Sequence, residues 1–377
     1  MKNLESFIKK NCSNRNRGRF RLEDAIFHCD IDGRYFDETS LKKIIGFVEK
    51  VNIIAKNAKV SVCINIDCKW FKDKLSILVL ECICYYLVTV REYKVKVNLT
   101  SQINIWTEGI KSSPLMLLDS YEQKSVQKYM KRFCFEIYHR HYRRLIKVDD
   151  FPLNSLSMFM TEIDSFLNVL GVSEKYRDKV SEVAVELIGN ATEHGETDCL
   201  IDIDVTNAYK KINSDKLYCG VNVAVINFSE KLVGEAIRKK MMVNENQEGR
   251  YKELLSAYIH HKCFFNDKYT QEDFFNIAAF QHKISGREHN ISTGGTGLTN
   301  LILALEELSD THICYMVSGD RAIELRKEYI RLNENKWIGF NREGDFLNAC
   351  PDPEVLINYG LIIPGVAYNL NFAVEKE

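Results

Sequence analysis

Hydrophobic residues recur with two different periods in the first third of the chain. They alternate with polar residues at 60–66 and 95–99, which predicts two strands. Between these strands, residues 75–93 are almost continuously apolar and long enough for a buried helix, and residues 41–55 have helical spacing. A strand, a helix and a second strand predict a βαβ unit with a right-handed crossover. We therefore expect a small α/β module over residues 22–118.

The same patterns return after residue 151 and predict a second, larger domain. Helical spacing covers 156–170 and 175–194, and strict alternation at 199–205 and 221–226 predicts two strands joined as a hairpin. A last strand covers 366–374. Between the hairpin and the end lies a long insert, residues 230–293, which is helical in part. The predicted fold class is therefore α+β.

Two further segments have no clear place in either domain. Residues 1–21 are polar and basic, and we expect a flexible arm there. Residues 119–150 form a basic, aromatic connector, with eight Lys or Arg residues between Lys124 and Lys147 against one acidic residue, Glu136. This composition is found on nucleic-acid surfaces, and also in amphipathic elements whose aromatic residues pack between domains. We favour the second interpretation, because the chain as a whole is not basic. His139 and His141 suggest a phosphoacceptor, but their neighbours are all basic or aromatic.

The overall composition narrows the classes of function. The chain is 45% hydrophobic with a net charge of −1, so no global field draws it to nucleic acid or to a membrane. The twelve cysteines have no metal-site spacing, and we expect reduced thiols in a cytoplasmic protein. No secretory signal and no membrane-spanning run is visible.

The second predicted helix of the larger domain carries a line of polar residues. Glu186, Asn190 and His194 follow one another at four-residue intervals, along the edge of an apolar stripe. An amide oxygen suits Mg²⁺, and a carboxylate one turn away can polarise a water or a hydroxyl. The alternative is an amphipathic helix with a solvated polar edge.

A glycine-rich segment lies about a hundred residues further on. It opens another predicted helix, where backbone N–H groups can surround an anion. Its residues are Gly294, Gly295, Thr296, Gly297 and Leu298.

Together these two motifs resemble those of the GHKL, or Bergerat-fold, ATPase superfamily. The first is similar to the N box, in the form found in anti-sigma-factor kinases and stand-alone ATP-binding domains, and the second is similar to the glycine box that closes over the phosphates. The resemblance covers roughly residues 155–374. It implies a two-layer sandwich, with a mixed sheet and helices on one face. It also implies that ATP is the ligand, that Asn190 ligates Mg²⁺, that Glu186 is the general base, and that His194 and the glycine box belong to the nucleotide site. The insert 230–293 corresponds to the family's ATP lid.

One motif of that family is altered here. Its members have an Asp-x-Gly-x-Gly turn, whose Asp accepts a hydrogen bond from adenine. In this chain Asn227 takes the place of the Asp and Ser229 that of the first glycine. Asn can still accept a hydrogen bond through its carbonyl oxygen, so Asn227 is expected to face adenine.

The stretch around Asp73 in the first domain resembles, weakly, the central strand, loop and helix of STAS domains. The phosphorylatable serine of that family is not matched, because Ser76 is out of register. A structural module that docks a protein partner is the preferred interpretation.

Three functions follow from the resemblance. The first is a nucleotide-dependent regulatory switch that hydrolyses ATP with Mg²⁺. The second is a protein serine/threonine kinase like the anti-sigma factors, and the third is a non-catalytic scaffold. Several members of the superfamily dimerise, so a homodimer is also considered.

Overall fold

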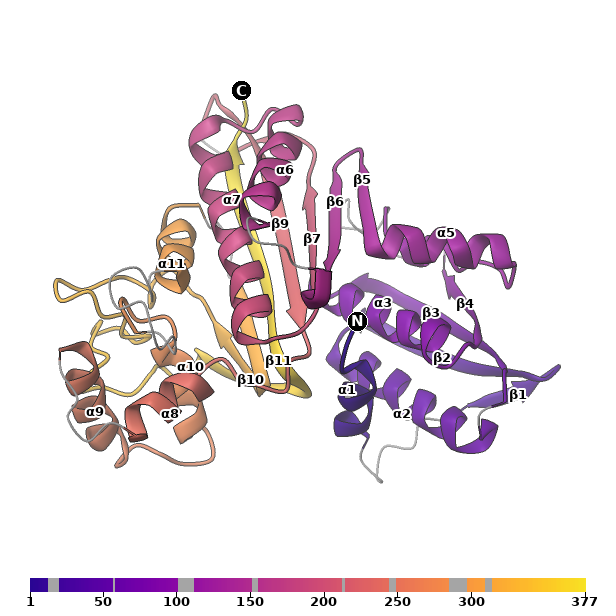
Figure 1. The fold of residues 1–377 in the computed structure, drawn as a ribbon. Helices are drawn as coiled ribbons and strands as arrows, with labels where there is room; N and C mark the ends of the chain where they lie inside the picture. The colour runs from indigo at the N-terminus through magenta and orange to yellow at the C-terminus, as the bar shows by residue number, and fades with distance from the viewer. Residues whose placement is uncertain are drawn as a thin grey trace.

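The structure is a computed structural model and describes residues 1–12, 20–56, 58–100, 112–150, 155–211, 214–243, 249–284, 297–308 and 314–377. Within these ranges the fold is α+β, as the sequence predicts. Ten α-helices accompany a four-stranded mixed sheet and a seven-stranded antiparallel sheet (Figure 1).

The N-terminal unit is built around the four-stranded sheet, in the order β1-β2-β3-β4. β2, β3 and β4 are parallel, which confirms the predicted βαβ arrangement, and β1 forms a hairpin with β2. Asp37 and Asp73 cap the starts of the two crossover helices with their side chains. The elements are α1 (Leu4–Asn11), β1 (Arg21–Glu23), β2 (Ile26–Phe36), α2 (Glu38–Ala55), β3 (Ser61–Phe71), α3 (Lys74–Thr89), β4 (Lys94–Leu99), a 3₁₀ turn (Pro114–Leu117) and α5 (Gln123–Cys134).

The seven-stranded sheet has the order β10-β11-β9-β7-β6-β5, with β8 paired to β9. All its described pairings are antiparallel, so the mixed sheet expected for this domain is wrong. The predicted hairpin of 199–205 and 221–226 is confirmed as β7 and β9. Its strands are β5 (Phe135–Tyr138), β6 (His141–Ile146), β7 (Cys199–Val205), β8 (Tyr209–Lys210), β9 (Leu217–Asn227), β10 (Tyr315–Glu324) and β11 (Leu356–Glu375).

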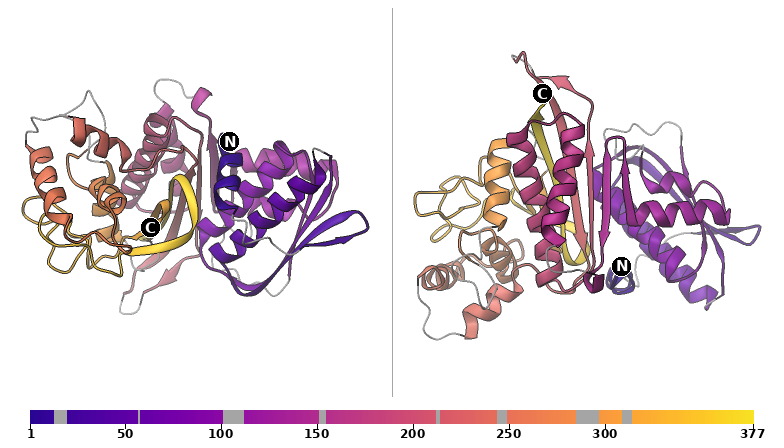
Figure 2. Two further views of the ribbon diagram at one scale, coloured as in Figure 1. Left: turned by 90° about the horizontal axis from the view of Figure 1, so that it is seen from below. Right: turned by 45° about the horizontal axis from the view of Figure 1, so that its top comes forward.

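Both faces of this sheet are covered, by different parts of the chain. One face packs against α6 (Ser155–Val169), α7 (Glu174–Gly189) and α11 (Gly297–Leu308). The other packs against the N-terminal unit, whose core continues into side chains such as Ala224 and Ile226 of β9. Figure 2 shows the sheet standing between these two layers. The resemblance implied helices on one face of the sheet only, and this description is incomplete because the N-terminal unit covers the other face.

The insert forms a helical unit beside the sheet. It contains α8 (Glu235–Val243), α9 (Arg250–His261) and α10 (Gln271–Ala278). The later segment around Trp337 and Phe346 packs into it: these rings stack at 5.2 Å, and Phe346 stacks on Phe274 of α10 at 5.4 Å. This part of the expected lid is thus anchored by a buried aromatic cluster.

The prediction of a flexible arm at residues 1–21 is wrong for residues 4–11, which form helix α1. Leu4, Phe7 and Ile8 are buried on one side of α1, at helical spacing. Asn11 fixes the end of this helix to β11: its Nδ2 donates to the Ile362 carbonyl oxygen at 2.8 Å, and its Oδ1 accepts from the Ile362 N–H at 2.7 Å.

The expectation that residues 119–150 only connect two domains is also wrong, because β5 and β6 belong to the seven-stranded sheet. The interpretation that the aromatic residues of this segment pack between the domains agrees better with the structure. Tyr129 and Phe133 are buried in the core shared with the N-terminal unit, and the Tyr129 hydroxyl donates to the Glu81 carbonyl oxygen at 2.8 Å.

A buried ion network joins helix α3 of the N-terminal unit to the seven-stranded sheet. Lys74 of α3 pairs with Asp202 and Asp204 of β7, and Arg143 of β6 pairs with Asp202 and with Glu81 of α3. His141 adds a contact from Nε2 to Asp202 at 2.8 Å. Burial alone would raise the pKa of Asp202, but Arg143, His141 and Lys74 hold it well below its usual value.

All twelve cysteines are free, in line with the expectation of reduced thiols. None of the helices in the described part of the chain is both long enough and apolar enough to cross a membrane.

Candidate functional site

Helix α7 carries the first motif at its C-terminal end. Val183 and Leu187 are buried against the sheet, while Glu186 and Asn190 are partly exposed beside them. Asn190 caps the helix, and the backbone continues in a single wider turn, Asn190–His194. The predicted helix and its polar edge are therefore present. The side chain of His194 lies outside the described residues.

Helix α11 runs antiparallel to α7, which brings the two motifs to the same end. Glu307, near the end of α11, pairs with Lys175 at 2.7 Å and with Lys179, both near the start of α7. From Glu307 back to Gly297 is roughly 15 Å of helix, and from Lys179 on to Asn190 is roughly 16 Å. The start of α11 therefore lies level with Asn190.

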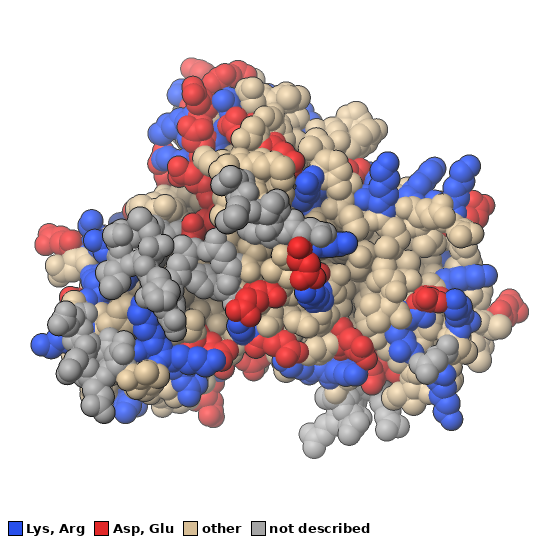
Figure 3. Space-filling model, in the orientation of Figure 1, with Lys and Arg blue, Asp and Glu red and all other residues tan. Residues whose placement is uncertain are grey.

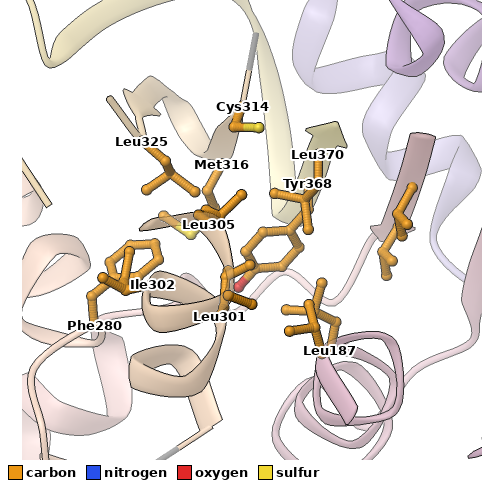
Figure 4. Packing of buried hydrophobic residues seen from close by; sticks show 14 of the residues in the cluster. Leu187, Phe280, Leu301, Ile302, Leu305, Cys314, Met316, Leu325, Tyr368 and Leu370 are labelled. Atoms are coloured by element: carbon orange, nitrogen blue, oxygen red, sulfur yellow. The ribbon is translucent and has the colours of Figure 1, made fainter. Parts of the chain in front are cut away.

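The glycine box is only partly visible. Gly294, Gly295 and Thr296 lie outside the described residues, and α11 begins at Gly297, followed by the partly buried Leu298. Figure 4 shows Leu301 of α11 beside Leu187 of α7, with Tyr368 of β11 against both. This packing fixes the start of the glycine-box helix relative to the first motif.

Asn227 ends β9, on the face of the sheet that α7 covers. It pairs with Cys199 of β7 and Val366 of β11, and only 1% of its surface is exposed. Its Oδ1 accepts a hydrogen bond from the Val366 N–H at 3.3 Å. An amide oxygen has two lone pairs, so one acceptor position remains.

Two glycines let the backbone approach the turn that follows Asn227. A Cβ on Gly195, at the end of the first motif, would meet the Ala191 carbonyl oxygen and lie 3.1 Å from the Cβ of Ser229. A Cβ on Gly365 would collide with the side chain of Asn227 and lie 2.7 Å from the Ser229 backbone nitrogen. Ser229 itself is held locally, since its hydroxyl donates to the Lys231 carbonyl oxygen at 2.9 Å. The first motif and the altered turn are therefore in contact.

Tyr368 is a residue of this region that the sequence did not single out. It points from β11 toward α7, and within the described residues its buried hydroxyl has no hydrogen-bond partner. Burial raises the pKa of this hydroxyl, and the nearby negative charge of Glu186 raises it further. In a strand that alternates cleanly, a tyrosine looks like an ordinary core residue, so only the structure reveals the unsatisfied group.

Helix α1 supports the same turn from the other face of the sheet. The rings of Phe7 and Phe228 lie 4.9 Å apart, and Glu230 contacts Ser6 and, at 3.7 Å, the ammonium of Lys10. The turn after Asn227 is therefore held between α1 and the end of the first motif.

Within the ranges that the structure describes, no group of three or more His, Cys, Asp or Glu side chains is arranged to hold a metal ion. A magnesium ion held by one amide and by phosphates needs no such group.

No family model, no curated protein and no solved structure matches the chain.

Proposed function

We propose that the chain is an ATP-binding protein of the GHKL type, in which the nucleotide acts as a regulatory switch and is hydrolysed with Mg²⁺. The observation that carries this proposal is the antiparallel packing of α7 and α11. This packing brings the start of the glycine-box helix level with Asn190 and close to Glu186. The two motifs are about a hundred residues apart in sequence.

The surroundings fit a ligand at this end of the sheet. A Cβ on Gly195 or Gly365 would collide with neighbouring atoms, so the backbone at Gly365 can lie close to the side chain of Asn227 only because this residue is a glycine. The hydroxyl of Tyr368, for which the described residues offer no hydrogen-bond partner, lies near Glu186. The N-terminus of a helix such as α11 favours a phosphate, because its first N–H groups have no partner within the helix.

The proposed roles follow from these positions. Asn190 would hold Mg²⁺, which when bound neutralises charge on the phosphates. Glu186 would accept a proton from the attacking water, and Asn227 would accept from adenine through the lone pair that Val366 leaves free. With a protein hydroxyl in place of water, the same Glu186 would serve a kinase.

One observation favours a second candidate, a non-catalytic scaffold. The amide oxygen of Asn227 is already engaged by a backbone N–H, and its side chain is almost fully buried. In that case adenine would find no strong acceptor at this position.

Calorimetric titration with a non-hydrolysable ATP analogue, with and without Mg²⁺, tests the proposal. We expect Mg²⁺-dependent binding, lost in Asn190→Ala. Glu186→Gln should keep binding and lower ATP turnover by about a hundredfold or more, the usual contribution of a general base. Glu182→Gln is the matched control, since Glu182 is an exposed carboxylate one turn earlier on α7.

Each outcome has a distinct meaning. Binding without turnover in the wild type would favour the scaffold or a kinase that needs its partner. Absence of binding, with and without Mg²⁺, would remove the proposed ATP site.

A further inference from the structure

A second surface lies around β5, at the edge of the seven-stranded sheet and at the end opposite the candidate nucleotide site. Among the described strands, β5 pairs only with β6. In an antiparallel edge strand, every second residue directs its N–H and C=O groups away from its neighbour, where another strand can pair with them.

A groove of about 1330 Å³ wraps around this edge. That volume exceeds the range of roughly 300–1,000 Å³ typical of small-molecule pockets. It is lined by Ile137 and Tyr138 of β5, by Met158, Phe166 and Val169 of α6, and by Arg132 of α5, among others. A groove of this volume has room for a longer segment than a compact small molecule would occupy.

One side of the groove is mainly apolar, and Thr161, Glu162 and Ser165 of α6 add polar groups to it. Ile137 lies opposite Tyr142, whose ring packs against Phe166 of α6 at 5.8 Å, so Ile137 faces the same side. Ile137 is 50% exposed, Met158 43% and Val169 85%. Large apolar side chains gathered in this way mark an interaction site.

The other side is basic. Glu136 faces away from α6 and pairs with Arg132, whose guanidinium lies 5.8 Å from the ring centre of Tyr138. Lys124, Lys128 and Arg132 follow at four-residue intervals and form one stripe along α5, a helix without acidic residues. Within the described residues, Lys124 and Lys128 are exposed and make no ion pair. Figure 3 shows Lys and Arg side chains projecting over α5.

We propose that β5 accepts an added strand from a partner protein, an extended segment in which apolar and acidic side chains alternate. A strand beside β5 sends successive side chains to opposite faces. One set would reach the apolar side at α6, and the other would reach Arg132, the end of the α5 stripe that lines the groove. This inference does not depend on the proposed nucleotide site.

Charge also argues against a second copy of the chain as the occupant. Pairing of two β5 strands about a two-fold axis would bring two basic stripes together, and such repulsion is a known means of keeping edges apart. β5 has only four residues, so backbone pairing adds few hydrogen bonds and the apolar contacts must supply much of the affinity.

The test uses the full chain and a fluorescein-labelled peptide of alternating Val and Glu residues, twelve in all, followed by fluorescence anisotropy. The comparison peptides replace Glu with Lys, or segregate the same residues into a Val half and a Glu half. We expect the alternating acidic peptide to bind at least about tenfold more tightly than either, which corresponds to one decade in Kd.

Two variants locate the site. Val169→Glu and Lys128→Glu should each weaken binding by roughly fivefold, the scale of one unfavourable rim contact. Val90→Glu, just after the end of α3, and Lys43→Glu on α2 are controls of the same chemistry on the N-terminal unit, and should bind as the wild type does. All four positions lie at the surface, so equal melting temperatures would exclude unfolding as the cause.

Several results would overturn the proposal. These are no binding of the alternating acidic peptide, equal binding of the three peptides, or unchanged binding by Val169→Glu and Lys128→Glu. Binding of oligothymidylate that Lys128→Glu abolishes, without any peptide preference, would assign the surface to nucleic acid. A dimer in sedimentation that Val169→Glu dissociates would assign it to a second copy of the chain.

Discussion

Asn3, the residue before α1, donates a hydrogen bond from Nδ2 to the carbonyl oxygen of Phe228, 2.8 Å away, across 225 positions of sequence. The acceptor belongs to the turn that follows Asn227. The first helix of the chain thus contacts the backbone next to the proposed adenine position, from the opposite face of the sheet.

Loss of this contact should loosen the turn. We expect Asn3→Ala to lower the free energy of unfolding by about 1 kcal/mol, the usual net value of one hydrogen bond. It should also weaken binding of the ATP analogue a few fold. Lys9→Ala, whose Nζ pairs with Glu5 at 2.9 Å on the exposed side of α1, should change neither quantity appreciably. Urea unfolding and calorimetry measure the two effects, and equal results for both variants would contradict the prediction.

The ion network between α3 and the seven-stranded sheet should be sensitive to loss of a single charge. Lys74→Met removes the cation that Asp204 shares with Asp202, while Asp202 keeps Arg143 and His141. We expect a loss of about 3–5 kcal/mol in the free energy of unfolding, because Asp204 stays buried without a cation. Lys72→Met removes a pair with Glu38 that solvent reaches, and should cost less than about 1 kcal/mol. Chemical denaturation of both variants tests this, and similar losses would show that Lys74 does not balance the two carboxylates.

Two buried tyrosines should respond to the same substitution in opposite directions. Tyr368→Phe removes a hydroxyl without a partner in the described structure, and should raise the free energy of unfolding by about 1 kcal/mol. Tyr142→Phe removes a hydroxyl that donates to Glu162 at 3.0 Å, and should lower it by a similar amount. Measurement without nucleotide gives the comparison directly. A destabilising Tyr368→Phe would mean that this hydroxyl has a partner in solution.

The aromatic cluster of the insert should make stability depend on pH. Burial lowers the pKa of His261 to about 4, and its ring contacts the Tyr269 hydroxyl at 2.7 Å and the Phe346 carbonyl oxygen at 2.8 Å. His260 lowers this pKa further, and Asp345 opposes it. A histidine whose pKa falls on folding adds stability above pH 6.5, and that stability is lost as the pH falls toward 4.

We therefore expect the wild type to lose roughly 2 kcal/mol between pH 7 and pH 4.5 through this group. His261→Gln should be less stable than the wild type at pH 7, and the difference should shrink as the pH falls. Unfolding curves at four pH values would show this. A constant difference would mean that His261 does not change protonation on folding.

The sequence predicted helices and strands best where the pattern was local. The period around Glu186 predicted α7, and the alternation of Val221, Val223 and Val225 predicted β9. The sequence did not predict strand β6, because Arg143 and His141 lie in a run of basic and aromatic residues that was interpreted as a connector. Their partners, Glu81 and Asp202, come from distant segments, and no local pattern shows that a charge will be neutralised in the core.

The same limit applies to the candidate site. The two motifs could be located from spacing alone, and the helices that carry them are present. Their meeting at one end of the sheet depends on the antiparallel packing of α7 and α11. The contacts of Gly365 and Tyr368 also depend on β11 lying beside β9, which only the assembled sheet determines.

The two hydrogen bonds between Asn11 and Ile362 have a consequence for how this protein reaches its native state. They join residues 351 positions apart, so α1 cannot reach its final environment until β11 has taken its place in the sheet. Closing so long a loop costs conformational entropy before any contact compensates for it, and folds dominated by such contacts form slowly. In stopped-flow refolding, the burial of α1 should therefore belong to the slowest phase.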